Sequence, residues 1–230
     1  MERRDFIRIC AGSLGAGAVA GSARGQGASP KRYPRARLMH APGAPLKAAQ
    51  LQVNRNYVFF YPFQATPCFL LNLGRALPPA RLEGTAQYTW PGGAGAAHSV
   101  VAYSAICSHQ LTYPTRDISF ISFRAGKNAV NPHADVIHCC SEHSQYDPAA
   151  GAKVVAGPAP QPLAAVLLEH DPASDQLSAV GTLGSEVFNA FFRKYEIKLS
   201  LEMGSRARQA AGDECLVTEL DNFCRQQVRC

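Results

Sequence analysis

Two short stretches of this chain each place a cysteine close to a histidine, and they constrain the fold more than any other feature. The first stretch is Cys107-Ser-His109 and the second is Cys140-Ser-Glu-His143. Residues 110–139 separate them, so only a fold that returns the chain to the same place can bring them together. Such a fold would present two thiolates and two imidazoles to a single site.

The segments around these stretches favour an all-β fold. Short runs rich in β-branched and aromatic residues alternate with turn residues, a pattern typical of an antiparallel sandwich or barrel. We expect strands within residues 56–63, 68–74, 86–90, 98–107, 117–124, 134–139, 152–157, 162–170 and 176–181. Residues 184–196 form the best helix candidate in this part of the chain.

Two thiolates and two imidazoles suit two kinds of metal centre. They could hold a tetrahedral zinc ion. They could equally hold a two-iron, two-sulfide (2Fe–2S) cluster, with the cysteines on one iron and the histidines on the other. The residue types alone leave both alternatives open.

The second stretch and the residues after it resemble a Rieske iron–sulfur protein. Tyr146-Asp147, the turn residue Gly151 and the segment Gly157-Pro158-Ala159-Pro160 follow in the order that is typical of that family. The resemblance covers residues 48–201 and implies an antiparallel β-sandwich with a cluster-binding subdomain. It also implies one 2Fe–2S cluster, whose ligands would be Cys107, His109, Cys140 and His143. Residues implied to surround the cluster are Ser144, Tyr146, Gly157, Pro158 and Pro160.

Two adjacent cysteines compete for one of these ligand positions. Cys140 to His143 has the C-x-x-H spacing of the family, whereas Cys139 to His143 would have one residue more. Neighbours in a strand point to opposite faces, so only one of the two can face the site. We expect the ligand to be Cys140.

The sequence departs from the respiratory members of the family in three ways. Those members carry an additional cysteine in each stretch, and the corresponding residues here are Thr112 and Glu142, so that disulfide cannot form. The segment between the stretches is longer and resembles an inserted hairpin, and the spacing from His143 to Tyr146 is one residue shorter. These departures favour the type of the arsenite-oxidase small subunit over a quinol-oxidising subunit.

The net charge of +6 comes from the N-terminal residues. Residues 1–37 hold eight basic and two acidic residues, and the remainder holds fifteen of each. A neutral body argues against nucleic-acid binding. Arg3 and Arg4, followed by a Gly/Ala-rich run, resemble a twin-arginine export signal in residues 1–23, which predicts a periplasmic protein and allows membrane attachment through an uncleaved leader.

The remaining chain divides into three expected parts. Residues 24–47 are basic and rich in Gly and Pro, which predicts a linker. Residues 48–203 form the Rieske-type domain, and residues 204–230 form a partly helical C-terminal tail that looks like an appendage. An exported protein can hold disulfides, so Cys215 could pair with either Cys224 or Cys230 in the tail. The alternative is that the five remaining cysteines are all unpaired: Cys68, Cys139, Cys215, Cys224 and Cys230.

The resemblance implies a one-electron transfer protein or subunit. Replacing two thiolates with two neutral imidazoles makes the oxidised cluster neutral rather than a dianion, which raises the reduction potential. The expected partners are a redox enzyme or larger catalytic subunit as donor and a cytochrome-like acceptor. The alternative is the quinol-oxidising Rieske subunit of a respiratory quinol–cytochrome c oxidoreductase.

Overall fold

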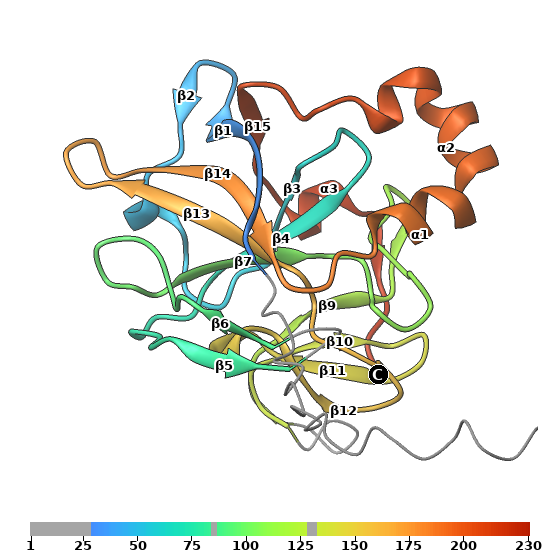
Figure 1. Cartoon of the computed structure of the whole chain (residues 1–230), viewed down its shortest axis with the longest axis horizontal. Helices are drawn as coiled ribbons and strands as arrows, with labels where there is room; N and C mark the ends of the chain where they lie inside the picture. Colours follow the sequence, from blue (N-terminus) through green and yellow to red (C-terminus); the bar gives the residue numbers. More distant parts are fainter. Residues whose placement is uncertain (1–28, 84–86, 128–132) are drawn as a thin grey trace, which may run out of the picture.

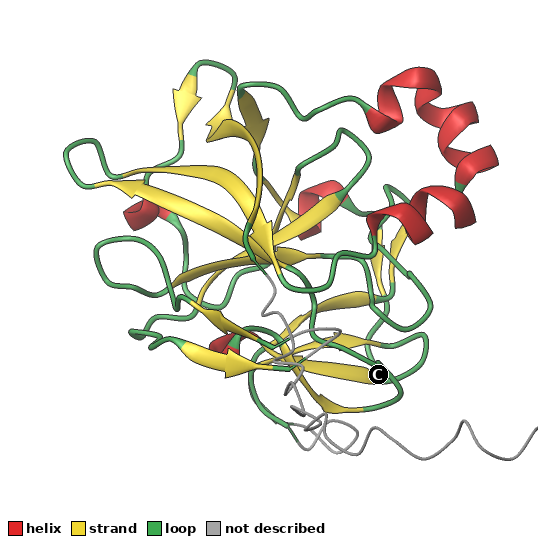
Figure 2. Cartoon of the chain, viewed as in Figure 1, coloured by secondary structure: helices red, strands yellow, loops and turns green. Residues whose placement is uncertain are grey.

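The computed structural model describes residues 29–83, 87–127 and 133–230. The predicted export signal in residues 1–23 lies outside the described residues, and so does the beginning of the predicted linker. In the described residues, strands dominate and the helices are short, as Figure 2 shows. The predicted all-β class is therefore confirmed.

A large curled sheet forms the body of the molecule (Figure 1). In spatial order its strands are β15 (Glu214–Leu216), β1 (Lys31–Ala41), β14 (Gln176–Leu183), β13 (Ala165–Asp171), β7 (Val100–Ser104), β4 (Pro67–Asn72), β3 (Tyr57–Phe60) and β16 (Thr218–Glu219), and β2 (Ala44–Pro45) pairs with β1. Neighbouring strands run antiparallel, except that β1 and β15 are parallel. Alternate residues of β4 enter two different cores, Phe69 and Leu71 on one face and Leu70 on the other, because side chains of a strand alternate between faces.

A smaller antiparallel sheet lies beside the first, below it in Figure 1. Its order is β12 (Lys153–Ala156), β11 (Ser144–Asp147), β10 (Val136–Cys139) and β9 (Ile121–Arg124). The β9–β10 pairing confirms the predicted hairpin between the two cysteine–histidine stretches. Two further strand pairs join β5 (Ala80–Leu82) to β6 (Tyr88–Trp90) and β8 (Ile118–Ser119) to β17 (Gln226–Gln227).

The predicted helix in residues 184–196 corresponds to α1 (Phe188–Lys194), and α2 (Glu196–Met203) follows it. Phe188, Phe191 and Phe192 of α1 are buried in a separate apolar cluster that also includes Ile106, next to Cys107 in the chain. The Lys194 ammonium donates to the carbonyl of Gln110, 2.5 Å away. Helix α1 therefore packs against and hydrogen-bonds to the loop that carries the first cysteine–histidine stretch. The other helical segments are η1 (Ala48–Gln50), η2 (Pro148–Ala150), η3 (Gly204–Arg208) and α3 (Leu220–Phe223).

The predicted linker is wrong for residues 31–41, which form strand β1. Ala36 and Leu38 are fully buried, while Arg35, before Ala36, and Arg37, between the two, are exposed. This alternation is a strand pattern, and the high content of basic residues obscured it. The strand is central because it pairs with β14 on one side and with β15 on the other.

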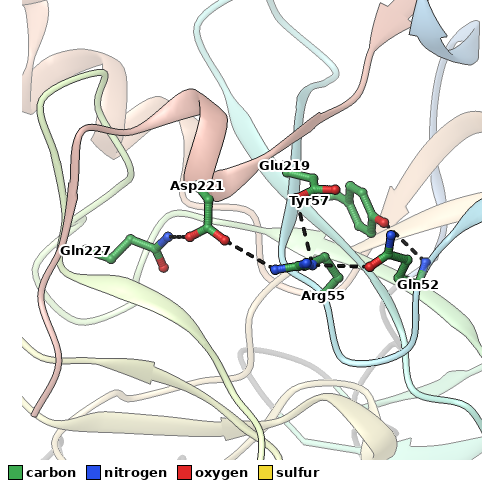
Figure 3. A network of polar contacts seen from close by, with 6 residues as sticks. All are labelled: Gln52, Arg55, Tyr57, Glu219, Asp221 and Gln227. Carbon is green, nitrogen blue, oxygen red and sulfur yellow. Dashed lines mark hydrogen bonds and ion pairs between the residues drawn. The ribbon is translucent and has the colours of Figure 1, made fainter.

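The C-terminal tail is also not an appendage. Residues 214–230, here called the C-terminal strap, pair with β1, β3 and β8 in turn. Figure 3 shows how strap residues are bound to the body: Arg55 lies 3.8 Å from the carboxylate of Glu219 and 3.5 Å from that of Asp221. The same figure shows Gln227 donating to Asp221. Such exposed ion pairs contribute little individually, and burial of apolar strap residues contributes more.

None of the described helices is long and apolar enough to cross a membrane.

Two cysteines of the body are buried thiols. Cys215 donates to the carbonyl of Phe60 at 3.1 Å, and burial raises its pKa to about 12. Burial also raises the pKa of Cys68 far above its usual value. Neither of the two pairings considered for Cys215 is formed, because Cys215 and Cys224 are free and Cys230 is bonded to another cysteine.

We predict that Cys68 and Cys215 resist alkylation in the native chain. Since the thiolate is the nucleophile, a neutral buried thiol should not react with iodoacetamide at about pH 8. Peptide mass spectrometry before and after denaturation measures this directly. Complete labelling of Cys215 in the folded protein within the time needed to label an exposed model thiol would contradict the burial described above.

Candidate metal centre

The first cysteine–histidine stretch lies in a tight loop after β7. Cys107 is fully buried, its amide donates to the carbonyl of Thr112 at 2.8 Å, and its carbonyl accepts from the amide of Leu111 at 3.0 Å. Leu111 has a positive φ of 60°, which closes the loop. The turn fixes Cys107 in the interior while His109 is only partly buried.

The second stretch forms the turn between β10 and β11. The register pairs Cys139 with Ser144 and Ile137 with Tyr146, so residues 140–143 form the turn itself. His143, the last residue of this turn, has a positive φ of 56° and is exposed. The hairpin therefore places Cys139 at the end of a buried strand and Cys140 outside it.

The cysteine that faces Cys107 is Cys139. Cys107, Ile137 and Cys139 belong to the same apolar core, and the Cys139 thiol interacts with the Cys107 sulfur. This interaction lowers the pKa of Cys107. The same interaction, together with burial, raises the pKa of Cys139.

The structure does not support the expectation that Cys140 is the ligand. The sulfur of Cys140 is bonded to that of Cys230 in a disulfide, 90 residues apart in sequence. The physical reason is the strand alternation of β10: Cys139 follows Ile137 onto the inner face, and Cys140 turns away toward the strap. The backbone carbonyl of Val228 in the strap lies 3.6 Å from the Cys140 sulfur.

The two predicted imidazole ligands have different surroundings. The Nδ1 atom of His109 is buried, and no hydrogen-bond partner lies within reach of it among the described residues. The ring of His143 instead lies 5.8 Å, centroid to centroid, from that of His138. The structure thus brings Cys107 together with Cys139, and places Cys140 and His143 near His138 and the strap.

Tyr146 touches the Cys107 sulfur directly. Its hydroxyl lies 3.2 Å from that sulfur and accepts a hydrogen bond from the amide of Ser108 at 3.2 Å. Burial raises the pKa of Tyr146, so the hydroxyl keeps its proton and can donate to a thiolate. Ser144, the other predicted donor, is fully buried, and its Oγ has no hydrogen-bond partner among the described residues.

We predict that Tyr146→Phe lowers the reduction potential of the loaded protein. A hydrogen bond to a sulfur ligand stabilises the reduced cluster more than the oxidised one, because the reduced cluster is more negative. Removing the bond therefore lowers the reduction potential. A differential loss of about 1 kcal/mol corresponds to a fall of about 40 mV for one electron. Spectroelectrochemical titration measures the shift, and Tyr88→Phe, which removes another buried hydroxyl, is the matched control. An unchanged potential in Tyr146→Phe would contradict the donor role.

The predicted proline segment lies against the turn of the second stretch. Gly157 has a φ of 84°, and a Cβ atom at this position would lie 2.5 Å from the carbonyl oxygen of His143. Only glycine allows the chain to approach so closely. The hydroxyl of Ser108 donates to the carbonyl of Gln161 at 2.7 Å, which ties the first loop to the same segment. Pro158 and Pro160 are exposed on its outer side.

A second group of metal-binding residue types lies on the opposite face of β10. Ligand atoms of His138, Cys140 and Cys230 lie within 4.8 Å of one another. The Nε2 atom of His138 is 3.5 Å from the Cys230 sulfur. Because the two sulfurs are joined in the disulfide, this group offers no thiolate.

The inner group fits a cluster with mixed ligation. It offers two adjacent buried cysteine sulfurs, an imidazole nitrogen without a partner, a tyrosine hydroxyl on one sulfur and a buried serine hydroxyl without a partner. Buried polar atoms are almost always hydrogen-bonded, so the unpartnered atoms of His109 and Ser144 are consistent with a bound group that would partner them. The residues of the inner group that would hold it are Cys107, Cys139 and His109. His143, the second imidazole expected from the sequence, lies beside His138 and would have to turn from there to join them.

Comparison with known proteins gives a partial likeness. No family model matches the sequence. The structure is similar to that of the soluble domain of the Rieske protein II (soxF) from Sulfolobus acidocaldarius, with 27% sequence identity over 65% of this chain and 78% of that chain, at a TM-score of 0.47. A likeness of this extent decides neither the fold nor the function, which rest on the residues described above.

Sequence reasoning missed Cys139 and the partner of Cys140. A signal for the first was present in the short spacing between His143 and Tyr146. Tyr146 pairs with Ile137 and faces the core with it. Cys139, two residues after Ile137, therefore faces the same side of the strand. The pairing of Cys140 with Cys230 had no comparable signal, because it depends on the path of the strap.

Proposed function

We propose that this chain is a one-electron transfer protein that holds one Rieske-type 2Fe–2S cluster. The observation that carries the proposal is the meeting of two buried cysteines, Cys107 and Cys139, from two separate loops in one apolar core. The unpartnered Nδ1 of His109, two residues after Cys107, supports it. The proposed ligands are Cys107, Cys139, His109 and His143, of which His143 would have to turn away from His138 to reach the cluster. When bound, the cluster supplies the ability to accept and release one electron.

The residues around the site have separable roles in this proposal. The apolar core around Cys107 and Cys139 excludes water from the sulfurs. The Tyr146 hydroxyl, 3.2 Å from the Cys107 sulfur, would donate to it as a thiolate, and the unpartnered hydroxyl of Ser144 is a further donor. His109 is only partly buried. As a ligand it would extend from the cluster to the protein surface, so an electron could leave through its ring over a shorter distance.

The subtype we favour is that of the arsenite-oxidase small subunit. Thr112 and Glu142 stand where respiratory members carry the cysteines of a loop-linking disulfide. The only disulfide in the described residues joins the second loop to the C-terminal strap instead. The alternative, a quinol-oxidising subunit, would require a retained membrane anchor and lacks the usual disulfide.

The proposed setting is the periplasm, reached through the twin-arginine segment in residues 1–23. The donor would be a redox enzyme or a larger catalytic subunit, and the acceptor a cytochrome-like protein. The absence of a recognisable catalytic group for substrate chemistry in the sequence favours an electron-transfer subunit over a self-contained enzyme. Membrane association through an uncleaved leader is part of the same proposal.

Analysis of iron, acid-labile sulfide and zinc in the purified protein tests this function. We expect about two irons and two sulfides per chain, as the cluster type requires. One zinc and no sulfide would support the structural zinc alternative and overturn the proposal. A potential that is modest and depends weakly on pH would then disfavour the quinol-oxidising alternative.

A further inference from the structure

We propose that the Cys140–Cys230 disulfide selects Cys139 as the second thiolate of the centre by removing Cys140 from competition. This inference rests on the proposed function. It assigns a positioning role to Cys230, the last residue of the strap, which the sequence alone did not connect with the site. The disulfide is called the latch below.

Without the latch, two adjacent thiols would compete for one iron position. Cys139 ends β10 and Cys140 begins the turn, so a shift of the strand register by one residue would exchange the two positions. The thiolate is the form that binds metals, and a free Cys140 would offer a second one next to Cys139. In a disulfide, however, a sulfur no longer forms a thiolate. The latch therefore leaves Cys139 as the available ligand.

The strap holds Cys230 where it can form this bond. Within the strap, the amides of Arg225, Gln226 and Val228 donate to the carbonyls of Arg116, Asp117 and Ser119 at 2.9, 3.1 and 2.8 Å. The guanidinium of Arg124 donates to the Val228 carbonyl. The Cα atoms of Cys140 and Cys230 are 5.7 Å apart, a typical separation for a disulfide. These contacts along the strap hold Cys230 next to Cys140.

The latch also holds Cys140 on the outer face of β10, away from Cys139. Cys140 is anchored by its amide, which donates to the carbonyl of Phe120 at 2.6 Å. On that side the Cys230 sulfur lies 3.5 Å from the buried ring of His138. Cys139 and Cys107 lie on the inner face. Turning Cys140 inward would require breaking its contacts on the outer face.

Cys230→Ser and Cys140→Ser break the same bond but differ in one respect that tests the inference. Cys230→Ser leaves a free Cys140 beside Cys139, whereas Cys140→Ser removes the competitor. In Cys230→Ser we expect a second paramagnetic species to replace part of the wild-type one, because a free Cys140 can now bind at the position of Cys139. In Cys140→Ser we expect a single species with the wild-type line shape and iron content.

The readouts are iron per chain, the electron paramagnetic resonance line shape after reduction, and peptide mapping of alkylated cysteines. Equal behaviour of the two variants would overturn the inference, because a purely structural latch would be lost equally in both. Alkylation of Cys140 in the non-reduced wild-type protein would also overturn it. The variant lacking both cysteines should behave like Cys140→Ser, and far-ultraviolet circular dichroism shows whether each variant folds.

Failure of the proposed function gives a different result. If the wild-type protein holds no iron and no sulfide, the function and the inference fall together. If the wild-type protein holds the cluster and the two single variants match, only the role of the latch is refuted.

Discussion

Replacing Cys139 by serine abolishes cluster incorporation, whereas the same replacement at Cys140 leaves it intact. The expectation follows from the position of Cys139 on the inner face of β10, in the same apolar core as Cys107. A serine hydroxyl has a much higher pKa than a thiol and is a poor ligand for iron in such a cluster. We expect the iron content of Cys139→Ser to fall more than tenfold, a loss of at least about 1.4 kcal/mol in binding free energy.

Iron and sulfide analysis of the two purified variants measures this difference. Cys140→Ser is a matched control because it changes the adjacent residue in the same way and lies outside the inner core. Circular dichroism must show that Cys139→Ser retains its β structure. The reverse result, in which Cys140→Ser loses the cluster and Cys139→Ser keeps it, would restore the ligand set expected from the family spacing.

Phe223→Ala should destabilise the whole domain, because the C-terminal strap contributes to its principal core. The Phe223 ring is buried, lies 5.7 Å from that of Phe60 and is covered by the guanidinium of Arg116 at 4.5 Å. Truncating a buried phenylalanine removes apolar contact and leaves a cavity, which costs about 3 kcal/mol. For a domain of this size we expect the melting temperature to fall by about 6–12 °C.

Urea and thermal unfolding measure the loss, with Asn222→Ala, at an exposed neighbouring position, as the control. A loss below about 1 kcal/mol in Phe223→Ala would mean that the strap is a peripheral appendage after all. The measurement is made with the disulfide intact, so that the change reflects packing alone.

Local patterns predicted the strands of the body and the meeting of two loops. The runs around Val100–Ser104 and Val136–Cys139 are short, apolar and β-branched, and they form β7 and β10 as expected. The Cys-x-His spacing was enough to single out Cys107, which is fully buried in its loop. These features depend on residues that are close in sequence, which is why a pattern can reveal them.

Long-range pairing could not be predicted in the same way. Strand β1 pairs in parallel with β15, joining Arg37 to Glu214, and neither segment has a pattern that names its partner. The same is true of Cys140 and Cys230. The choice between Cys139 and Cys140 was open to a local argument, yet it depended on where β10 ends, and a change of one residue reverses the face.

Pulsed electron paramagnetic resonance of the dithionite-reduced protein tests the central claim most directly. The account predicts a signal from a reduced 2Fe–2S cluster with nitrogen couplings from two imidazoles, and His109→Ser should remove at least one of these couplings or the whole signal. A protein that contains zinc and gives no signal, or a cluster signal without nitrogen coupling, would contradict it.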